Sequence, residues 1–351
     1  MNNYPFNLIQ HNKPPLKDKT ILNERPFINY KHSFKDDAKL FVPGDSLETA
    51  INTAIAVGEP LLITGEPGTG KTQSAYYAAF KLDVEPVFHF QVKSDSTAKD
   101  LLYNFDMIKY FHDANIRYFD TLDKNYNCGL NKDDNYNINE NELDKKNSTQ
   151  NNIKKLDKKD YIEKRVLWLA FLKAQKENHS VVLLIDEIDK APRDFPNDLL
   201  HELDKMEFIV KETEPEEKIS CPNNLKPIVF ITSNSERRLP EPFLRRCVYH
   251  HINFDDNLIK EAVYAREKEY KKINPNINKD FLDLAISRFI ELREENLRKK
   301  PATGELLVWI NVLAAAFDIS SNKLRNNLSD LPYLGALIKD HQDIQTLKTR
   351  R

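Results

Sequence analysis

Short apolar runs alternate with helical patterns through the first two thirds of the chain. The runs are rich in aliphatic and β-branched residues and are bounded by polar or Gly/Pro turns, so we predict strands at 61–64, 87–92, 181–185, 228–232 and 248–252. Segments with helical spacing of apolar positions separate most of these strands. Such alternation is typical of a parallel sheet covered by helices on both faces. We therefore predict an α/β domain over residues 40–255.

The α/β pattern is expected to begin with a helix near residue 45. Asp45 and Glu48 have the spacing of a capping box, and the apolar positions that follow share one helical face: Leu47, Ala50, Ile51, Ala54 and Ile55. A turn at 58–60 then leads into the first predicted strand.

After residue 255 the strand patterns stop. Apolar positions recur there with helical spacing in three or four segments, marked by Leu258, Ile259, Ala262 and Val263, by Phe281, Leu282, Ala285, Phe289 and Ile290, by Leu306, Leu307, Ile310, Leu313 and Ala314, and by Leu331, Leu334, Leu337 and Ile338. Residues 256–351 are therefore predicted to form a small all-α domain.

Two polar stretches interrupt this organisation. Residues 1–39 carry Pro14-Pro15 and few apolar positions, and we interpret them as a flexible or loosely docked arm. Residues 123–160 are crowded with Asn, Lys and Asp and have almost no large aliphatic residues. That segment buries too little apolar surface to offset the entropy of ordering it, so we predict a disordered insertion.

Composition narrows the classes of partner. Across 351 residues, 52 Lys and Arg stand against 54 Asp and Glu, which gives a formal net charge of −2. Bulk electrostatics therefore disfavour direct binding of nucleic acid or of an anionic membrane. The sequence contains no apolar run near the ~20 residues that a membrane span needs, and it does not begin as a signal or transit peptide does. We expect a cytoplasmic protein whose three cysteines, Cys128, Cys221 and Cys247, are reduced thiols.

The most specific motif follows the first predicted strand. It is a P-loop that matches at every defined position: Gly65, Glu66, Pro67, Gly68, Thr69, Gly70, Lys71 and Thr72. Its glycines let successive N–H groups turn toward phosphate oxygens, and the following helix adds the positive end of its dipole. Lys71 is expected to reach the β- and γ-phosphates, and Thr72 to offer its hydroxyl to Mg²⁺. The motif predicts binding of a nucleoside triphosphate.

Further polar residues follow two other predicted strands. Asp186 and Glu187 end the purely aliphatic run 181–185, so they lie where ligands bind in open parallel sheets. Asp186 is predicted to hold the Mg²⁺ shell and Glu187 to polarise the attacking water. Asn234 ends a strand expected between the other two and could orient that water or contact the γ-phosphate. Arg245 and Arg246 precede the last strand and could stabilise charge on a neighbour's phosphates, although a solvated basic loop is the simpler alternative.

In order and spacing, these segments resemble the two Walker motifs, sensor 1 and arginine finger of AAA+ ATPases. The run 186–192, Asp-Glu-Ile-Asp-Lys-Ala-Pro, and the Leu-Pro-Glu at 239–241 resemble the MoxR branch more narrowly. The resemblance covers roughly residues 40–340. It implies ATP as the nucleotide, Asn234 as sensor 1 and Arg246 as the finger, with Arg245 as the alternative. It also implies a homo-oligomeric ring, commonly a hexamer, and an all-α lid.

The chain departs from the family pattern at the lid. A sensor 2 arginine is usual early in the third lid helix, but the matching stretch 301–306 offers Glu305, and Lys299 or Lys300 are the available cations nearby. The resemblance also implies that the stretch 92–103 faces the working surface of the ring, where Lys93, Lys99 and Tyr103 could touch a client; a polar loop leading into a helix is the alternative.

Two functions remain open at this level. One is a ring-forming MoxR-type ATPase that remodels a protein partner, in complex maturation or in a bacterial defence system. The other is a nucleotide-driven motor subunit of a restriction-like complex that acts on nucleic acid. A small-molecule kinase would need an acceptor pocket that the sequence does not indicate.

Overall fold

A five-stranded parallel sheet forms the centre of the computed structural model, which describes residues 6, 8–9, 18–23, 34–129, 156–234, 236–316 and 321–349. The strand order is β2-β5-β8-β1-β9, and every neighbouring pair is parallel. The strands are β1 (Leu61–Gly65), β2 (Phe88–Gln91), β5 (Val182–Asp186), β8 (Ile228–Ser233) and β9 (Val248–Ile252). All five predicted strands are present, and the α/β fold is confirmed.

The register of the sheet brings the ends of three strands together. Gln91 of β2 pairs with Asp186 of β5, and Thr64 of β1 pairs with Ser233 of β8. Because β8 lies between β5 and β1, the residues that follow these strands meet at one edge. The prediction that Asn234 follows the strand between the other two is therefore correct.

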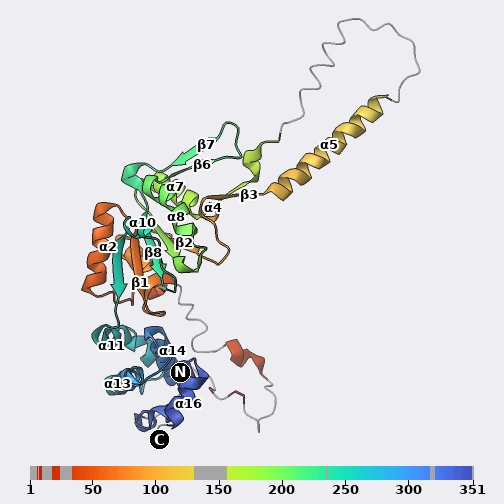
Figure 1. The fold of residues 1–351 in the computed structure, drawn as a ribbon. Helices are drawn as coiled ribbons and strands as arrows, with labels where there is room; N and C mark the ends of the chain where they lie inside the picture. The colour runs from red at the N-terminus through yellow and green to blue at the C-terminus, as the bar shows by residue number, and fades with distance from the viewer. Residues whose placement is uncertain are drawn as a thin grey trace, which may run out of the picture.

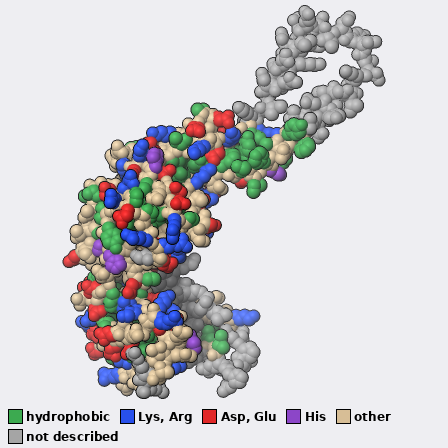
Figure 2. Space-filling model, viewed as in Figure 1, with side chains coloured by type: hydrophobic (Ala, Val, Ile, Leu, Met, Phe, Trp, Pro, Cys, Tyr) green, Lys and Arg blue, Asp and Glu red, His purple; other side chains and the backbone are tan. Residues whose placement is uncertain are grey.

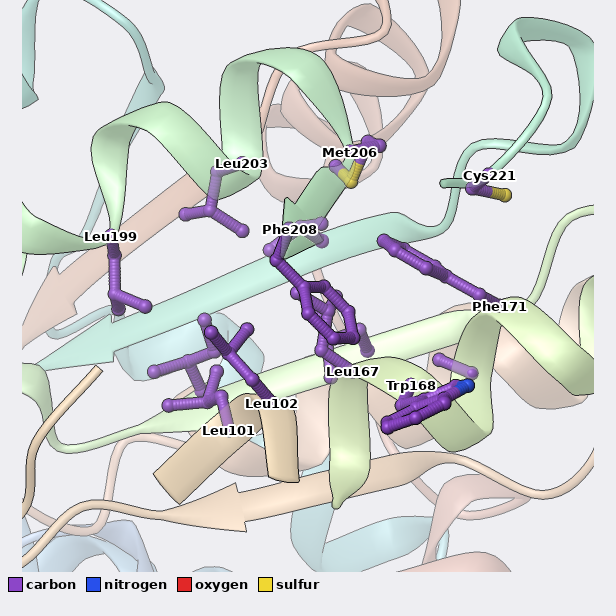
Figure 3. Close-up of a cluster of buried hydrophobic side chains, with 14 of the residues drawn as sticks. Leu101, Leu102, Leu167, Trp168, Phe171, Leu199, Leu203, Met206, Phe208 and Cys221 are labelled. Carbon is purple, nitrogen blue, oxygen red and sulfur yellow. The ribbon is translucent and has the colours of Figure 1, made fainter. Parts of the chain in front are cut away.

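Two apolar cores flank the sheet, and alternate strand residues face them. On one face, α2 (Asp45–Val57) and α3 (Lys71–Leu82) pack on Leu61, Ile63 and Leu184. On the other, α4 (Lys99–Leu102), α7 (Val166–Glu177), α8 (Phe195–Asp198) and α9 (Leu200–Lys205) enclose a larger cluster (Figure 3). Trp168, Phe171 and Phe208 lie at the centre of that cluster, and their rings contact one another edge to face or tilted.

The first helix begins differently from the prediction. Gly44 occupies the N-cap of α2 with φ 73°, no side chain caps the helix, and Asp45 is already its first residue. Glu48 instead accepts a hydrogen bond of 2.5 Å from the Tyr77 hydroxyl. The capping box is therefore wrong, because the buried hydroxyl of Tyr77 competes for the same carboxylate.

Two antiparallel ribbons that the sequence did not indicate extend the α/β body. One pairs β3 (Tyr103–Phe105) with β4 (Ile162–Lys164), and the other pairs β6 (Glu207–Val210) with β7 (Glu217–Ser220). Tyr103 is buried and stacks on Phe208, while Lys99 pairs with Glu212 at 2.7 Å. The prediction that Tyr103 could touch a client is therefore wrong, since its ring fills the core beside the hairpin.

A long helix, α5 (Met107–Gly129), follows β3 and projects from the body on the side away from the C-terminal helices (Figure 1). Between 107 and 119 it exposes a set of large apolar side chains: Met107, Ile108, Phe111, Ile116, Tyr118 and Phe119 (Figure 2). Residues 123–129 of the predicted disordered insertion belong to this helix. Residues 156–160 are also described and lead through η4 (Lys158–Tyr161) into β4, whereas the middle of that insertion lies outside the described residues.

Part of the predicted N-terminal arm is built into the body. The helix α1 (Phe34–Ala38) packs on α3, where Gln73 donates to the Phe34 carbonyl at 2.7 Å and the Phe34 ring stacks on Tyr76. A short 3-10 turn, η1 (Lys19–Asn23), precedes it, and most of the remaining arm lies outside the described residues. Residues 34–38 of the predicted arm therefore form a short helix that docks on α3.

The C-terminal part, which we call the lid, contains helices and no strands among its described residues. Its helices are α11 (Asp256–Tyr264), α12 (Glu267–Ile273), α13 (Lys279–Glu294), α14 (Thr303–Ala315), α15 (Ser321–Leu324) and α16 (His341–Thr349) (Figure 1). They share an apolar core centred on Trp309, whose indole N–H donates to the Pro332 carbonyl at 2.7 Å. Among the described helices, none is both long and apolar enough to cross a bilayer.

Candidate active site

The P-loop joins β1 to α3, as its sequence predicts. Gly65, Gly68 and Gly70 have φ values of 151°, 78° and 91°, which side-chain-bearing residues rarely adopt. At Gly70 a Cβ would also lie 2.6 Å from the Phe41 ring. Helix α3 begins at Lys71, so its free N–H groups face the loop. This backbone can cradle phosphate groups.

Lys71 points back over the loop. Its Nζ donates to the carbonyls of Gly65 at 2.9 Å and Glu66 at 2.8 Å. Burial lowers the pKa of this ammonium, and the nearby carboxylates of Asp189 and Asp186 oppose that effect. A buried cation held by neutral carbonyls gains strongly when an anionic ligand reaches it.

Asp186 ends β5 and is tightly held. The Thr232 hydroxyl donates to its Oδ1 at 2.5 Å, and the Thr72 hydroxyl lies 2.9 Å from Oδ1 and 3.1 Å from Oδ2. Burial alone would raise the pKa of Asp186, but the polar groups of His89, Thr232 and Thr72 outweigh it and lower that pKa. Asp186 is thus a carboxylate at neutral pH. Its oxygens and the Thr72 hydroxyl are the hard donors that fit Mg²⁺, a metal that keeps water ligands beside few protein groups.

Glu187 follows with a left-handed backbone, φ 61° and ψ 50°, which turns the chain out of the strand. Its N–H donates to Thr232 Oγ1 at 2.8 Å, so the same threonine fixes both acidic residues. Its carboxylate accepts from Asn234 Nδ2 at 3.3 Å, and from Gln91 Nε2 and Lys190 Nζ at 2.5 Å each. The structure therefore brings the predicted base and the predicted sensor residue into direct contact.

The P-loop, Asp186, Glu187 and Asn234 share one cleft with a volume of about 300 Å³. It is lined by Phe34, Pro67, Gly68, Gly70, Lys71, Thr72, Gln73, Asp186, Glu187, Thr232 and Asn234. Of the predicted phosphate-loop residues, Gly65, Glu66 and Thr69 lie next to this lining. Phe34 was not anticipated, because residue 34 lay in the predicted arm.

Asp189 is a second residue that the sequence analysis did not single out. It is buried and accepts from the backbone N–H groups of Asn234 at 3.2 Å and Glu236 at 2.9 Å. Arg237 donates to the Ala191 carbonyl at 3.0 Å and ties the same two loops together. Asp189 thus sets where Asn234 lies. The position of Asp189, two residues after Glu187, was the one sequence feature that could have indicated this role.

Arg246 lies outside this cleft. It follows α10 (Glu241–Leu244), its side chain is 47% exposed, and its Nε pairs with Asp204 Oδ2 at 2.9 Å. Arg245 is also exposed. Neither arginine lines the cleft of its own chain.

The lid contacts the P-loop through a residue that the sequence did not reveal. Arg293, near the end of α13, is buried and donates to Glu66 Oε2 at 3.0 Å. Its guanidinium also contacts the Pro301 carbonyl and lies 3.6 Å from the Phe254 ring centroid. Glu305, at the expected sensor 2 position, accepts from the Ala302 N–H instead. The cation at this joint therefore comes from α13 and not from the start of α14.

A second cleft, of about 200 Å³, adjoins the other side of the P-loop. Phe41, Val42 and Leu47 line it from the segment before β1, and Leu258 and Ile259 line it from α11. Gly304 N–H also donates to the Gly68 carbonyl at 3.3 Å, which seats the lid on the loop. An apolar cleft beside a phosphate loop has the character of a site for a nucleotide base.

The parallel sheet, the P-loop and the acidic strand end together define a P-loop nucleotide-binding α/β protein. Residues 61–256 match the family model described as the ATPase family associated with various cellular activities (AAA). The chain belongs to this family, and it is accordingly a nucleotide-binding ATPase. No curated protein matches the chain.

Solved structures of other proteins resemble this chain remotely. A candidate ATPase from Cytophaga hutchinsonii is 13% identical, with a TM-score of 0.37 over 92% of this chain and 94% of that one. NtrX from Brucella abortus, in complex with ADP, is 14% identical, with a TM-score of 0.45 over 95% of this chain and 68% of that one.

Proposed function

We propose that the chain is a ring-forming, MoxR-type AAA+ ATPase that hydrolyses ATP to remodel a protein partner. The observation that carries the hydrolytic part is the contact between Asn234 and Glu187 beside the Thr72–Asp186 pair. The motif 186–192 and the Leu-Pro-Glu before the arginines support the MoxR branch.

The chemistry follows from the positions of these groups. Thr72 and Asp186 would hold Mg²⁺, and the bound ion would neutralise part of the phosphate charge. Lys71 exchanges the loop carbonyls for phosphate oxygens. Glu187 accepts a proton from the water whose oxygen attacks the γ-phosphorus, and the bond from that phosphorus to the bridging oxygen breaks to release ADP and phosphate. Asn234 orients the Glu187 carboxylate.

Glu187 must first be freed to act as a base. Lys190 and Gln91 both donate to its Oε2, so two donors already occupy the oxygen that would receive the proton. Hydrolysis therefore requires the contacts of Lys190 and Gln91 with Glu187 to lengthen. A neighbouring subunit that moved the loop around Glu187 would change these contacts and so the rate of turnover.

A neighbouring subunit is the proposed source of the arginine. Arg246 is exposed and lies outside the cleft of its own chain, which supports a role across a subunit boundary. We propose a homo-oligomer, by family resemblance a hexameric ring, in which Arg246 of one copy stabilises charge on the phosphates of the next.

The surface supports a protein partner. The exposed apolar side chains of α5 are suited to apolar protein surfaces, whereas binding of nucleic acid requires clustered positive charge and the net charge is −2. The partner would respond to movements of the body from which α5 projects.

Glu187→Gln is the direct test. The variant should bind ATP as the wild type does and lose turnover, because glutamine cannot accept the proton from water. The partner would be sought by mass spectrometry of proteins retained with this variant in ATP and released with ADP. Unchanged turnover would remove Glu187 as the base. Strong stimulation of the isolated wild-type chain by DNA or RNA would replace the proposal with the motor of a nucleic-acid-processing complex.

A further inference from the structure

His89 lies behind the carboxylate that is proposed to serve Mg²⁺. It is the second residue of β2, and its Nε2 is 3.4 Å from Asp186 Oδ2. On its other side, Nδ1 lies 3.0 Å from the Tyr76 hydroxyl. Tyr76 follows Thr72 by one turn of α3, so the two share a helical face. The imidazole thus connects two elements of the site.

The surroundings of His89 restrict its orientation. The rings of Phe34 and Tyr76 lie edge-on to it, with centroids at 6.1 Å each. Its Nε2 atom is buried and has no aligned hydrogen-bond partner among the described residues. Asp186 Oδ2 is the charged oxygen that it faces, and a small shift of either side chain would bring the pair to hydrogen-bonding distance.

Electrostatic interactions favour one tautomer of the His89 imidazole. If Nδ1 carried the proton, the lone pair of Nε2 would face the Asp186 carboxylate, and two buried acceptors would repel each other. If the Tyr76 hydroxyl donates to Nδ1, the proton lies on Nε2 and points at Asp186. Burial raises the pKa of Tyr76, so its hydroxyl keeps the proton that this arrangement requires.

We propose that His89 is a positioning residue that fixes the metal-binding orientation of Asp186, and that Tyr76 fixes the tautomer of His89. Carboxylates that bind a metal are commonly held by hydrogen bonds from residues behind them, and these bonds fix their orientation. An Nε2–H directed at Oδ2 would hold the Asp186 carboxylate in one orientation. The proposal rests on the function proposed above, specifically on Asp186 as part of the Mg²⁺ shell.

The register of β2 explains why this residue can act here. Gln91 lies two positions after His89, on the same face of the strand, and it contacts Glu187. Two successive residues of that face therefore contact Asp186, the last residue of β5, and Glu187, which follows it. A histidine that served packing alone would need no polar neighbour at both ring nitrogens.

The test compares Mg²⁺ dependence in four variants. His89→Leu removes the N–H, His89→Gln places an amide N–H where Nε2 lies, and Tyr76→Phe removes the hydroxyl. Tyr77→Phe is the matched control, because the Tyr77 hydroxyl on the same helix serves Glu48 instead. Binding of a fluorescent ATP analogue is titrated with Mg²⁺ and repeated in EDTA, beside steady-state hydrolysis and a thermal melt.

We expect the Mg²⁺ concentration for half-maximal effect to rise about tenfold in His89→Leu and about threefold in Tyr76→Phe. It should stay within about twofold of wild type in His89→Gln and Tyr77→Phe, and binding in EDTA should be unchanged in all four. Wild-type Mg²⁺ dependence in both His89→Leu and Tyr76→Phe would overturn the proposal. If His89→Leu fails to fold, the Tyr76→Phe result decides alone.

Asp186→Asn separates this inference from the proposed function. Loss of the Mg²⁺ effect in Asp186→Asn with wild-type behaviour in the His89 and Tyr76 variants would refute the positioning role alone. Unchanged Mg²⁺ dependence in Asp186→Asn would refute the metal assignment, and the role of His89 with it.

Discussion

Arg293 of the lid donates to the Glu66 carboxylate in the P-loop at 3.0 Å, which links the two parts of the chain beside the predicted phosphate site. The two ends of this pair differ in environment. Arg293 is buried under Phe254 and the Pro301 carbonyl, whereas Glu66 is half exposed.

Arg293→Met should therefore destabilise the protein by about 2–3 kcal/mol, since it leaves a buried carbonyl unpaired and removes the packed guanidinium. Glu66→Gln should cost less than about 1 kcal/mol, because solvent screens the half-exposed partner. Urea unfolding of both single variants and the double variant gives the coupling energy. Equal losses in the two single variants would contradict this account.

Asn234→Ala should lower kcat by about 10²-fold while the affinity for ATP changes little, because the amide orients Glu187 and is not needed to hold the phosphates. Steady-state kinetics with equilibrium nucleotide binding distinguish these effects. Asn276→Ala, at an exposed lid position, is the matched control and should behave as wild type. A fall in affinity as large as the fall in kcat would place Asn234 on the bound nucleotide instead.

Arg246→Ala should lose about 10³-fold or more in turnover with normal ATP binding. Mixing it with Lys71→Ala should restore part of the activity, since a subunit with an intact cleft then meets a neighbour with an intact arginine. Arg245→Ala tests the alternative register in the same mixing assay. If the mixture stays as inactive as its components, Arg246 does not act across a boundary.

Trp309→Ala should destabilise the lid by about 3–5 kcal/mol, because it empties the centre of the lid core and removes the donor to Pro332. Val308→Ala is a suitable control, because the Val308 side chain lies next to Trp309 in sequence but is 51% exposed. This variant should change stability by less than about 0.5 kcal/mol. Denaturant unfolding followed by circular dichroism measures both.

Cys221 and Cys247 should resist alkylation at pH 8. Burial raises the pKa of both thiols, that of Cys247 to about 12, so the reactive thiolate of Cys247 forms only as the pH approaches that value. At pH 8 Cys247 is therefore almost entirely in its unreactive thiol form. Mass spectrometry after N-ethylmaleimide treatment should find both unmodified in native protein and modified in urea. Rapid native labelling of Cys247 would show that its burial is transient.

Much of the nucleotide-binding body could be predicted from local pattern. The strands were recognisable because they are short, aliphatic and bounded by turns, and the P-loop because its glycines and Lys71 are defined by chemistry. The convergence of Asp186, Glu187 and Asn234 followed from a general rule, that parallel strands end at one edge. The catalytic roles of these residues remain predictions.

Contacts between segments distant in sequence could not be predicted in this way. Phe34 lies in a polar stretch, and only the docking of α1 on α3 places it in the cleft. No local sequence pattern indicated the role of Arg293, because its partner Glu66 is 227 residues away in the chain. His89 sits within an ordinary strand pattern, and its relation to Asp186 depends on the register of β2 against β5. The short ribbons were missed because three or four residues carry too little periodicity.

The left-handed backbone of Glu187 implies a trade-off between stability and activity. A side chain in that conformation costs about 1–2 kcal/mol relative to glycine. Glycine at residue 187 would relax the turn after β5, so Glu187→Gly should unfold at a higher temperature and hydrolyse no ATP. The fold alone would favour glycine at this turn, so a carboxylate there fits the proposed role of Glu187 in turnover.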